Sequence, residues 1–389
     1  MHRADDICPR PESVETGGTR PLAAPIYPTS VWICESTDQA ERMLAGDEAG
    51  YVYQRDAHPN ADMFADKCRL LHNAERVAVA ASGMSALAAA MLSQTRSGDH
   101  ILVARRLYGR SQLLLTQEAA RCGIDSTIVD TDDRNAVEAA FRERTRLVVV
   151  ETIANPTLQV ADLRGLADIA HRHQAKLLVD NTFATPVLCR PLDCGADLVL
   201  ESVSKQMNGH SDVMLGLLAG RTADWSRVPL VLSAWGLAAS PFDCWLASRG
   251  LATLHLRVER ACANAMRAAE FLRGRATVRQ VDYPGFPDHP QHDLALRQFG
   301  NRFGSVVTFH LEGGRVAADA FIRRARRIPF CPSLGEATTS LSHPESTSHR
   351  GLTSDERKAL GIDGGTIRLS LGLESPEFIL EALTEALDD

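Results

Sequence analysis

The sequence predicts an α/β fold, with a large domain built on a mostly parallel sheet and a smaller α+β domain at its C-terminal end. From about residue 60, short apolar runs alternate with segments of helical periodicity. The apolar runs are continuous and rich in Val and Leu, which is typical of parallel strands covered on both faces. Beyond about residue 260, helices mix with alternating strands such as GSVVTFHL and TIRLSLGL, and this change of pattern indicates a second unit.

Five apolar runs account for the predicted sheet: ERVAVAA, HILVARR, RLVVVET, KLLVDNT and ADLVLES. The segments between them, such as GRSQLLLTQEAARCG and ADLRGLADIAHRHQ, are predicted helices. A long arginine-rich helical stretch begins at SPFDCWLASRG and leads into the second unit. Two later helix starts are specified locally, one by Ser375 as N-cap with Pro376 behind it, the other by the capping-box spacing of TSDE at 353–356.

A chain of 389 residues is too long for one simple core. We divide it into an N-terminal arm (1–58), a large α/β domain (59–250) and a smaller α+β domain (251–389). The prolines of RPLAAPIYPTSVW oppose a long helix in the arm.

The composition is that of a soluble globular protein, with 44% hydrophobic and 23% charged residues. A formal net charge of -7 gives no reason to expect a nucleic acid or an anionic membrane as partner. No apolar run approaches the ~20 residues that span a bilayer, and the polar, Pro-rich start is unlike a signal peptide. Nine cysteines are scattered without a C-x-x-C pair or zinc-ligand spacing. We therefore expect reduced thiols in a cytoplasmic protein, and no metal site.

Lysine is rare in this chain, and one lysine stands at a strand end. Of the 42 Lys+Arg residues only four are lysines, so a plain positive charge is normally supplied by arginine. Lys205 follows the apolar run ADLVLES. Arginine cannot form an imine, whereas lysine can. The three other lysines, which have ordinary surface contexts in the sequence, are Lys67, Lys176 and Lys358.

Asp180 closes the strand before Lys205. A buried carboxylate needs a partner, and taken alone Asp180 could simply cap the following turn. Together, an amine that forms a Schiff base and a carboxylate that keeps a pyridine nitrogen protonated are the two groups that pyridoxal phosphate requires. Ser82-Gly83-Met84 leads another strand into a helix, where free N–H groups suit a phosphate; an ordinary strand-to-helix turn is the alternative. The ends of parallel strands meet at one ligand-binding edge.

These residues lie in motifs that resemble one known family, the cysteine/methionine metabolism enzymes that depend on pyridoxal phosphate. The family includes cystathionine γ-synthase, cystathionine β- and γ-lyases, methionine γ-lyase and O-acylhomoserine sulfhydrylases. The motifs are, in chain order, APIYPTSVW, YVYQRDAHPN, SGMSA, LYG, VDNTFATP, SVSK, GHSDVM, WLASRGLATLHLR, PSLG, HPESTSH and IRLSLGLE. The resemblance implies the fold-type I (aspartate-aminotransferase-like) architecture, an amino-acid substrate, and a homo-oligomer made of two catalytic dimers.

The resemblance also implies a role for each matching position. Lys205 would form the Schiff base and shuttle protons, and Asp180 would pair with the pyridine nitrogen. Tyr108 would stack on the ring and help with proton transfer, and Asn155 would contact the ring hydroxyl. The residues implied to hold the phosphate are Gly83, Met84, Ser202 and Ser204.

Further positions are implied to serve the substrate and the neighbouring subunit. Arg368, with Ser333, would bind the substrate α-carboxylate, because a guanidinium matches that planar anion. Tyr53 and Arg55 would reach the phosphate of the neighbouring subunit, and Tyr51 is a substrate-side candidate. The alternatives are edge-strand aromatics for the two tyrosines and a surface residue for Arg368.

The implied chemistry is removal of the Cα proton and loss of a β-substituent, or a second deprotonation at Cβ that permits γ-elimination or γ-replacement. GHSDVMLG resembles the cystathionine-processing lyases and γ-synthases, whereas HPESTSH resembles the sulfhydrylases. We expect a cystathionine-type carbon–sulfur lyase or a cystathionine γ-synthase, with O-acylhomoserine sulfhydrylase or methionine γ-lyase as alternatives. A non-catalytic pyridoxal-phosphate-binding protein and an aminotransferase are further alternatives.

Four positions depart from the family pattern. Arg110 follows LYG where a small residue or cysteine is common. If Arg110 faces the site it could bind a second carboxylate; if it points outward it is a surface arginine. Thr338 stands where many γ-acting members have glutamate, Ser204 replaces a threonine, and His58 replaces a smaller residue.

Overall fold

The computed structural model describes residues 3–12, 19 and 21–388. Its centre is a seven-stranded sheet with the order β1-β7-β6-β5-β4-β2-β3. The strands are β1 (Arg76–Ala80), β2 (His100–Ala104), β3 (Asp125–Val129), β4 (Thr145–Glu151), β5 (Lys176–Asp180), β6 (Leu198–Ser202) and β7 (Gly216–Gly220). Strands β3, β2, β4, β5 and β6 are parallel neighbours, while β7 is antiparallel to both β6 and β1. Strand β1 therefore runs in the same direction as β6, and six carboxyl ends meet at one edge.

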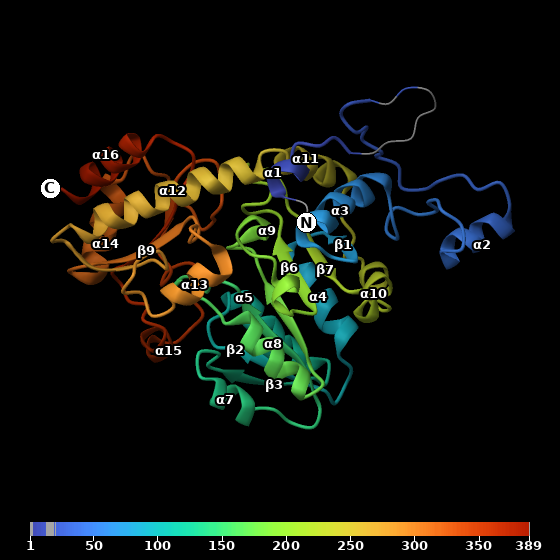
Figure 1. Ribbon diagram of the computed structural model, residues 1–389, viewed down its shortest axis with the longest axis horizontal. Helices are drawn as coiled ribbons and strands as arrows, with labels where there is room; N and C mark the ends of the chain where they lie inside the picture. Colours follow the sequence, from blue (N-terminus) through green and yellow to red (C-terminus); the bar gives the residue numbers. More distant parts are fainter. Residues whose placement is uncertain (1–2, 13–18, 20, 389) are drawn as a thin grey trace.

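Helices follow most strands and cover the sheet (Figure 1). Helix α4 packs against β6 and β7, α8 against β5, and α3 against β1 and α11. The central strands β2 and β4 are almost wholly buried, as their unbroken Val/Leu runs predict. The helices of this part are α3 (Pro59–His72), α4 (Gly83–Gln94), α5 (Gly109–Leu113), η1 (Leu114–Glu118), α6 (Ala119–Arg121), α7 (Arg134–Ala139), α8 (Leu163–Arg172), α9 (Thr185–Leu188), η2 (Pro191–Cys194), η3 (Thr222–Asp224), α10 (Val228–Ala234) and α11 (Pro241–Leu251).

A second sheet lies in the C-terminal part, at the left of Figure 1. Its four strands have the order β10-β11-β9-β8 and are all antiparallel to their neighbours. They are β8 (Val278–Asp282), β9 (Val306–Leu311), β10 (Ser340–Ser342) and β11 (Thr366–Ser370). The helices around this sheet are α12 (Leu254–Arg273), α13 (His292–Phe299), α14 (Gly314–Arg324), α15 (Ser354–Ala359) and α16 (Pro376–Leu387).

The N-terminal segment contains two short helices, α1 (Ala4–Ile7) and α2 (Thr37–Ala45). Figure 1 shows α2 far from the body of the molecule. Large apolar side chains on this segment are solvent-exposed, Leu22 by 82% and Ile33 by 102%. Apolar side chains left uncovered in one chain mark a surface that another chain can cover.

The predicted fold class is confirmed: a large sheet with parallel strands is joined to a smaller sheet with helices. All five predicted strands of the large sheet are present, as are both predicted helix starts, with Ser375 as N-cap of α16 and a capping box at Thr353 and Glu356. Strands β3, β7, β8 and β10 were not predicted, because they are short or interrupted by polar or glycine residues. The predicted limits at 58 and 250 fall directly before α3 and near the end of α11, and the division into domains stays a prediction.

The surface role predicted for Lys67 is wrong. Lys67 in α3 is buried, and its Nζ lies 2.7 Å from Oε1 of Glu12. The helix has a polar sequence at this point, but the N-terminal segment covers it and supplies the carboxylate. Lys358 is exposed, and Lys176 is half-buried with its Nζ 2.7 Å from Oδ1 of Asp224. None of the helices in the described ranges has the length and apolar character needed to cross a membrane.

Candidate active site

A cavity of about 280 Å³ lies at the edge where the strands of the large sheet end. Its walls come from the β1–α4 turn, from the segments after β2, β4, β5 and β6, and from the loop before β10 together with β11. Ten of the residues predicted for the site line this one cavity: Gly83, Met84, Tyr108, Asn155, Asp180, Ser202, Ser204, Lys205, Ser333 and Arg368. Residues separated by up to 285 positions in the chain are therefore brought together, as the strand-end rule predicts.

Lys205 is held in the turn that follows β6. Its backbone N–H donates to the carbonyl of Ser202 at 3.0 Å, and its Nζ donates to Oγ of Ser333 at 3.1 Å. Burial lowers the pKa of the amine, and the nearby Arg368 lowers it further, while Glu336 opposes both effects. A lowered pKa increases the fraction of neutral amine, which is the form that can act as a nucleophile or a base.

Two carboxyl groups lie side by side beneath the cavity. Glu151 and Asp180 are register partners at the ends of β4 and β5. Burial raises the pKa of both, and the charge of Asp180 helps to raise the pKa of Glu151 to about 8. Asp180 also accepts a hydrogen bond from the backbone N–H of Thr182 at 3.0 Å, which favours its ionised form. A cationic group bound at Asp180 would be neutralised by a carboxylate already held in place.

Glu151 fixes two neighbouring backbone segments. Its Oε1 accepts from the N–H of Tyr108 at 2.6 Å, and its Oε2 accepts from the N–H of Asn155 at 3.0 Å. Tyr108 is thereby held as the N-cap of α5, and this residue, which is 38% exposed, lines the wall of the cavity. Sequence reasoning passed over Glu151, although it ends the run RLVVVE directly before the turn that carries Asn155.

The β1–α4 turn has the geometry of an anion site. Ser82 caps α4 by accepting from the N–H of Ser85 at 3.0 Å, which leaves the N–H groups of Gly83 and Met84 facing the cavity end of the helix. A Cβ on Gly83 would lie 2.9 Å from Cβ of Ser202. Glycine is thus required because β6 approaches this turn closely.

The two serines of this wall, Ser202 and Ser204, make different hydrogen bonds. Ser202 lies half-buried against the turn, and its backbone N–H donates to Oγ1 of Thr182 at 2.8 Å. The Ser204 hydroxyl donates to the carbonyl of Leu215 at 3.2 Å and accepts from its N–H at 3.0 Å. Ser204 therefore also ties the lysine turn to the segment before β7.

Arg368 projects from β11 of the smaller sheet and is almost fully buried. One terminal nitrogen donates to Oδ1 of Asn155 at 2.9 Å and the other to the carbonyl of Ser333 at 2.8 Å. Its Nε has no partner among the described residues. Burial lowers its pKa to about 10, although the charge of Glu336 counteracts this effect. A buried guanidinium with an unsatisfied donor is a site for an incoming anion.

Three predicted residues lie outside this cavity, on the N-terminal segment. The Tyr51 hydroxyl donates to Oδ2 of Asp62 at 2.8 Å. Tyr53 is 43% exposed, and the guanidinium carbon of Arg55 lies 4.9 Å from the centre of its ring. The roles predicted for Tyr51, Tyr53 and Arg55 stay predictions.

Of the unusual positions, Ser204 lines the cavity itself, and Arg110 lies beside it. Arg110 lines a second cavity of about 630 Å³, which shares Tyr108, Pro332, Ser348 and Arg368 with the first. Its side chain is exposed there, so it faces an extension of the site rather than the catalytic cavity itself.

Of the two other departures from the family pattern, the structure explains His58 but not Thr338. His58 is the N-cap of α3, where its Nδ1 accepts from the N–H of Ala61 at 3.1 Å. Thr338 is exposed and does not line the cavity; nothing in the structure explains the threonine.

Pyridoxal phosphate fits this set of residues. Four features surround the one cavity: the Nε of Arg368 without a partner among the described residues, the N-terminus of α4 where a Cβ on Gly83 would clash, the two carboxyl groups, and the buried amine of Lys205. The residues present therefore offer hydrogen-bonding or charged partners for the phosphate, the ring nitrogen and the substrate carboxylate, and a nucleophilic amine for the aldehyde carbon. No group of three or more His, Cys, Asp or Glu side chains in the described ranges could hold a metal ion.

Comparisons with known proteins agree with this chemistry. The model of the family described as "Cys/Met metabolism PLP-dependent enzyme" matches residues 10–388. An L-methionine γ-lyase of Porphyromonas gingivalis is 40% identical over 370 residues, which cover 94% of this chain and 92% of that protein.

Two solved structures share the whole fold. Cystathionine γ-synthase of Xanthomonas oryzae, in complex with cystathionine, has a TM-score of 0.94 and 34% identity over 100% of this chain and 98% of that one. A putative O-acetylhomoserine (thiol)-lyase of Campylobacter jejuni, which contains a pyridoxyl-lysine phosphate, has a TM-score of 0.96 and 25% identity over 100% of both chains. The chain belongs to the family of Cys/Met metabolism enzymes that use pyridoxal phosphate as cofactor.

Proposed function

We propose that this enzyme cleaves or replaces a substituent on the γ-carbon of a sulfur-containing amino acid, with cystathionine-type substrates as its main class. The observation that carries the proposal is the convergence of Lys205, Asp180 and Arg368 on one cavity, with Arg110 lining its extension. The first three residues serve the shared chemistry, and the fourth concerns the choice of substrate.

The roles of the residues follow from their positions. Arg368 would bind the substrate α-carboxylate through its free Nε and a terminal nitrogen, which fixes Cα near Lys205. When bound, pyridoxal phosphate supplies an electron sink for the charge that develops at Cα. Lys205 would hold the cofactor's aldehyde carbon, and once freed by the substrate its Nζ would take the proton from Cα and return protons at later steps.

The other residues of the cavity hold the cofactor in a fixed orientation. Asp180 would stay ionised beside the ring nitrogen, and the N-terminus of α4 with Ser202 would bind the phosphate. Tyr108 would cover the ring from the side of α5. Ser333, which now accepts from Lys205, would orient the amine between these steps.

The extended cavity favours substrates with a second anionic group. Arg110 and Arg350 both line it, and neither side chain has a hydrogen bond or ion pair within the described part of the chain. The carboxylate of Glu356, on the same wall, is already engaged by the N–H of Thr353 at 2.7 Å. Unpaired arginines suit a distal carboxylate, such as that of cystathionine or of an O-succinyl ester.

Methionine γ-elimination is the second candidate. It is supported by the 40% identity to an L-methionine γ-lyase. Methionine ends in a neutral thioether, so it would leave the arginines of the extended cavity without a partner. O-acylhomoserine sulfhydrylation is the third candidate, and a non-catalytic binding protein is opposed by the complete set of site residues.

Product identification separates these candidates. The cofactor-loaded protein is incubated with L-cystathionine, L-methionine, or an O-acylhomoserine together with cysteine or sulfide, and products are identified by mass spectrometry. 2-Oxobutanoate and cysteine from cystathionine support the main proposal, as does cystathionine formed from the ester and cysteine. Turnover confined to methionine, or to the ester with sulfide, refutes it.

Two variants test the residues. Lys205→Ala should fold normally, lose the absorbance band of the covalently held cofactor, and lose activity; unchanged activity would refute its role. Arg110→Gln should raise KM for cystathionine by about 10- to 100-fold, since a hydrogen bond to a charged group contributes ~1.5–3 kcal/mol, and should leave methionine kinetics unchanged. Arg105→Gln, an exposed arginine outside both cavities, is the matched control.

We also propose that the active form is a dimer of dimers in the cytoplasm. The support is the exposed apolar surface of the N-terminal segment and the position of Tyr53 and Arg55 outside the chain's own cavity. All nine cysteines are free, which fits a reducing compartment. Sedimentation analysis at several concentrations tests the assembly, and a stable monomer with full activity would refute it.

A further inference from the structure

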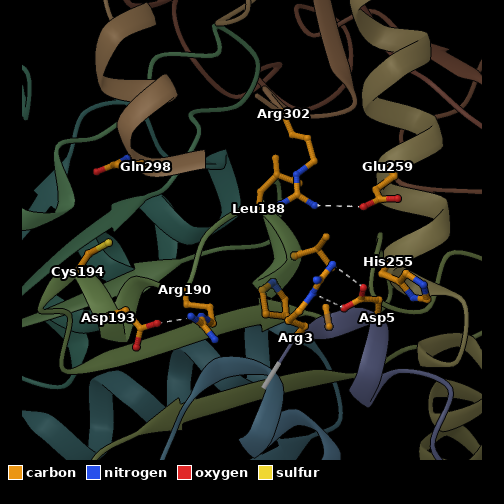
Figure 2. Close-up of a pocket in the computed structure, with 13 residues that line it drawn as sticks. Arg3, Asp5, Leu188, Arg190, Asp193, Cys194, His255, Glu259, Gln298 and Arg302 are labelled. Atoms are coloured by element: carbon orange, nitrogen blue, oxygen red, sulfur yellow. Dashed lines mark hydrogen bonds and ion pairs between the residues drawn. The ribbon is translucent and has the colours of Figure 1, made fainter. Parts of the chain in front are cut away.

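A third cavity, away from the cofactor site, is lined by a cysteine that has a neighbouring thiol. The cavity has a volume of about 510 Å³ and lies between α1, the α9–η2 segment, α12 and α13 (Figure 2). Cys194, the last residue of η2, is half-buried on its wall. Cys189, the C-cap of α9, lies behind it and is 2% exposed.

The local fold brings these two thiols into contact. Cys189 ends α9 with its N–H donating to the carbonyl of Thr185 at 3.1 Å. The turn at Pro191–Cys194 then reverses the chain, so that the Cys194 side chain returns to Cys189, and the two thiols share a side-chain hydrogen bond. Two cysteines five positions apart on a tight turn need little further motion to approach each other.

The surroundings give the two sulfurs different characters. The hydrogen bond with Cys189 lowers the pKa of Cys194 to about 7, and the charges of Arg164 and Arg190 contribute to this in spite of burial. The same hydrogen bond and burial raise the pKa of Cys189 well above its usual value. The Cys194 thiol, which lines the cavity, is therefore the more easily ionised of the two, and the buried Cys189 thiol stays protonated and donates to it.

The other buried cysteines lack this combination. Burial raises the pKa of the Cys8, Cys68, Cys244 and Cys262 thiols, so these are packed as apolar groups. Cys122 is exposed. An easily ionised thiol on a cavity wall beside a second thiol is the arrangement typical of a peroxide-sensitive site.

We propose that Cys189 and Cys194 form a reversible dithiol–disulfide site, in which Cys194 reacts with hydrogen peroxide and Cys189 resolves the product. In the first step the Cys194 sulfur attacks one peroxide oxygen; the S–O bond forms, the O–O bond breaks, and the leaving hydroxide takes up a proton as water. In the second step the Cys189 sulfur, losing its proton, attacks the sulfenic sulfur; the S–S bond forms and a second water leaves. The dithiol is oxidised by two electrons and the peroxide is reduced. A small thiol reverses the reaction by thiol–disulfide exchange.

The sequence allows a direct test on the wild-type holoenzyme. Trypsin does not cut Arg190 because Pro191 follows it, so residues 177–205 form one tryptic peptide that contains both cysteines and no other. The enzyme is treated with a few equivalents of hydrogen peroxide, quenched with an alkylating agent and digested. We expect this peptide without alkylation and lighter by two hydrogens, and both cysteines alkylated again after treatment with dithiothreitol. The measurement does not depend on catalytic activity.

Variants separate the two roles. In Cys189→Ser, the sulfenic acid at Cys194 should persist and be trapped by dimedone, whereas Cys194→Ser should give neither adduct nor cross-link. Cys122→Ser, which removes an exposed cysteine elsewhere, should behave as the wild type. A wild-type peptide that stays doubly alkylated, a cross-link to any other cysteine, or failure of dithiothreitol to restore the thiols would overturn the proposal.

Discussion

Replacing Gly83 with alanine tests the geometry assigned to the phosphate-binding turn. A Cβ at this position would lie 2.9 Å from Cβ, 3.1 Å from Oγ and 3.2 Å from Cα of Ser202. The Cα belongs to the end of β6, so rotation of the serine side chain cannot relieve the whole contact. Either the first turn of α4 or the end of β6 must move, and both contribute to the wall that would hold the phosphate.

The size of the effect follows from two opposing terms. Overpacking in a well-packed site costs about 1–3 kcal/mol. Alanine is a better helix former than glycine by up to about 1 kcal/mol, and only part of this applies at the first residue of α4. We expect the free energy of unfolding of the cofactor-free protein to fall by ~1–2 kcal/mol.

The loss of cofactor affinity should be larger than the loss of stability. Displacing the turn misaligns the N–H groups of Gly83 and Met84, and a hydrogen bond to a charged group contributes ~1.5–3 kcal/mol. We expect the affinity for pyridoxal phosphate to fall by about 10- to 100-fold.

The assay combines a spectroscopic titration with pyridoxal phosphate and urea unfolding of the cofactor-free protein. Gly351→Ala is the matched control, because a Cβ there meets no atom within 4 Å. A second comparison sets Gly83→Ala/Ser202→Gly against Ser202→Gly alone, where the removed Cβ should restore most of the lost stability. Unchanged cofactor affinity in Gly83→Ala, or no recovery in the double variant, would refute the close-approach explanation.

Three further predictions follow from individual contacts. Arg368→Lys cannot keep both hydrogen bonds of the guanidinium, so kcat/KM should fall by about 10- to 100-fold, mainly through KM; steady-state kinetics with unchanged KM would contradict this. Burial lowers the pKa of His349 from 6.5 to about 4, so between these values the unfolded state binds more protons, and the free energy of unfolding should fall as pH decreases from 6.5 to 4. His349→Gln should weaken this dependence in urea titrations at several pH values, and an identical pH slope would contradict it. Glu12→Gln leaves Lys67 buried without its carboxylate, and should destabilise the protein by about 3 kcal/mol, whereas an unchanged urea midpoint would show that the pair contributes nothing.

The sequence predicted the ligand edge because chemistry and periodicity coincide there. Lys205 and Asp180 each follow a continuous apolar strand, and the Ser82-Gly83-Met84 turn joins a strand to a helix. Each of these could be recognised from its immediate neighbours in the chain. Contacts formed across the fold could not be predicted in this way. The Lys67–Glu12 pair joins residues 55 positions apart, and its burial depends on how the N-terminal segment crosses α3.

Glu151 was missed for a related reason, since its function comes from its neighbour on the next strand. The register of β4 and β5 places it beside Asp180, and two adjacent buried carboxyl groups cannot both ionise at low cost. A bound pyridinium would favour the ionised form of Asp180, which leaves Glu151 as the group that keeps its proton near neutral pH. Glu151 would then add no competing negative charge beside the ring, while its oxygens still hold the N–H groups of Tyr108 and Asn155. With the cofactor bound, the carboxyl pair would thus supply a single negative charge for the ring nitrogen and still hold two backbone segments in position, which an isolated aspartate could not do.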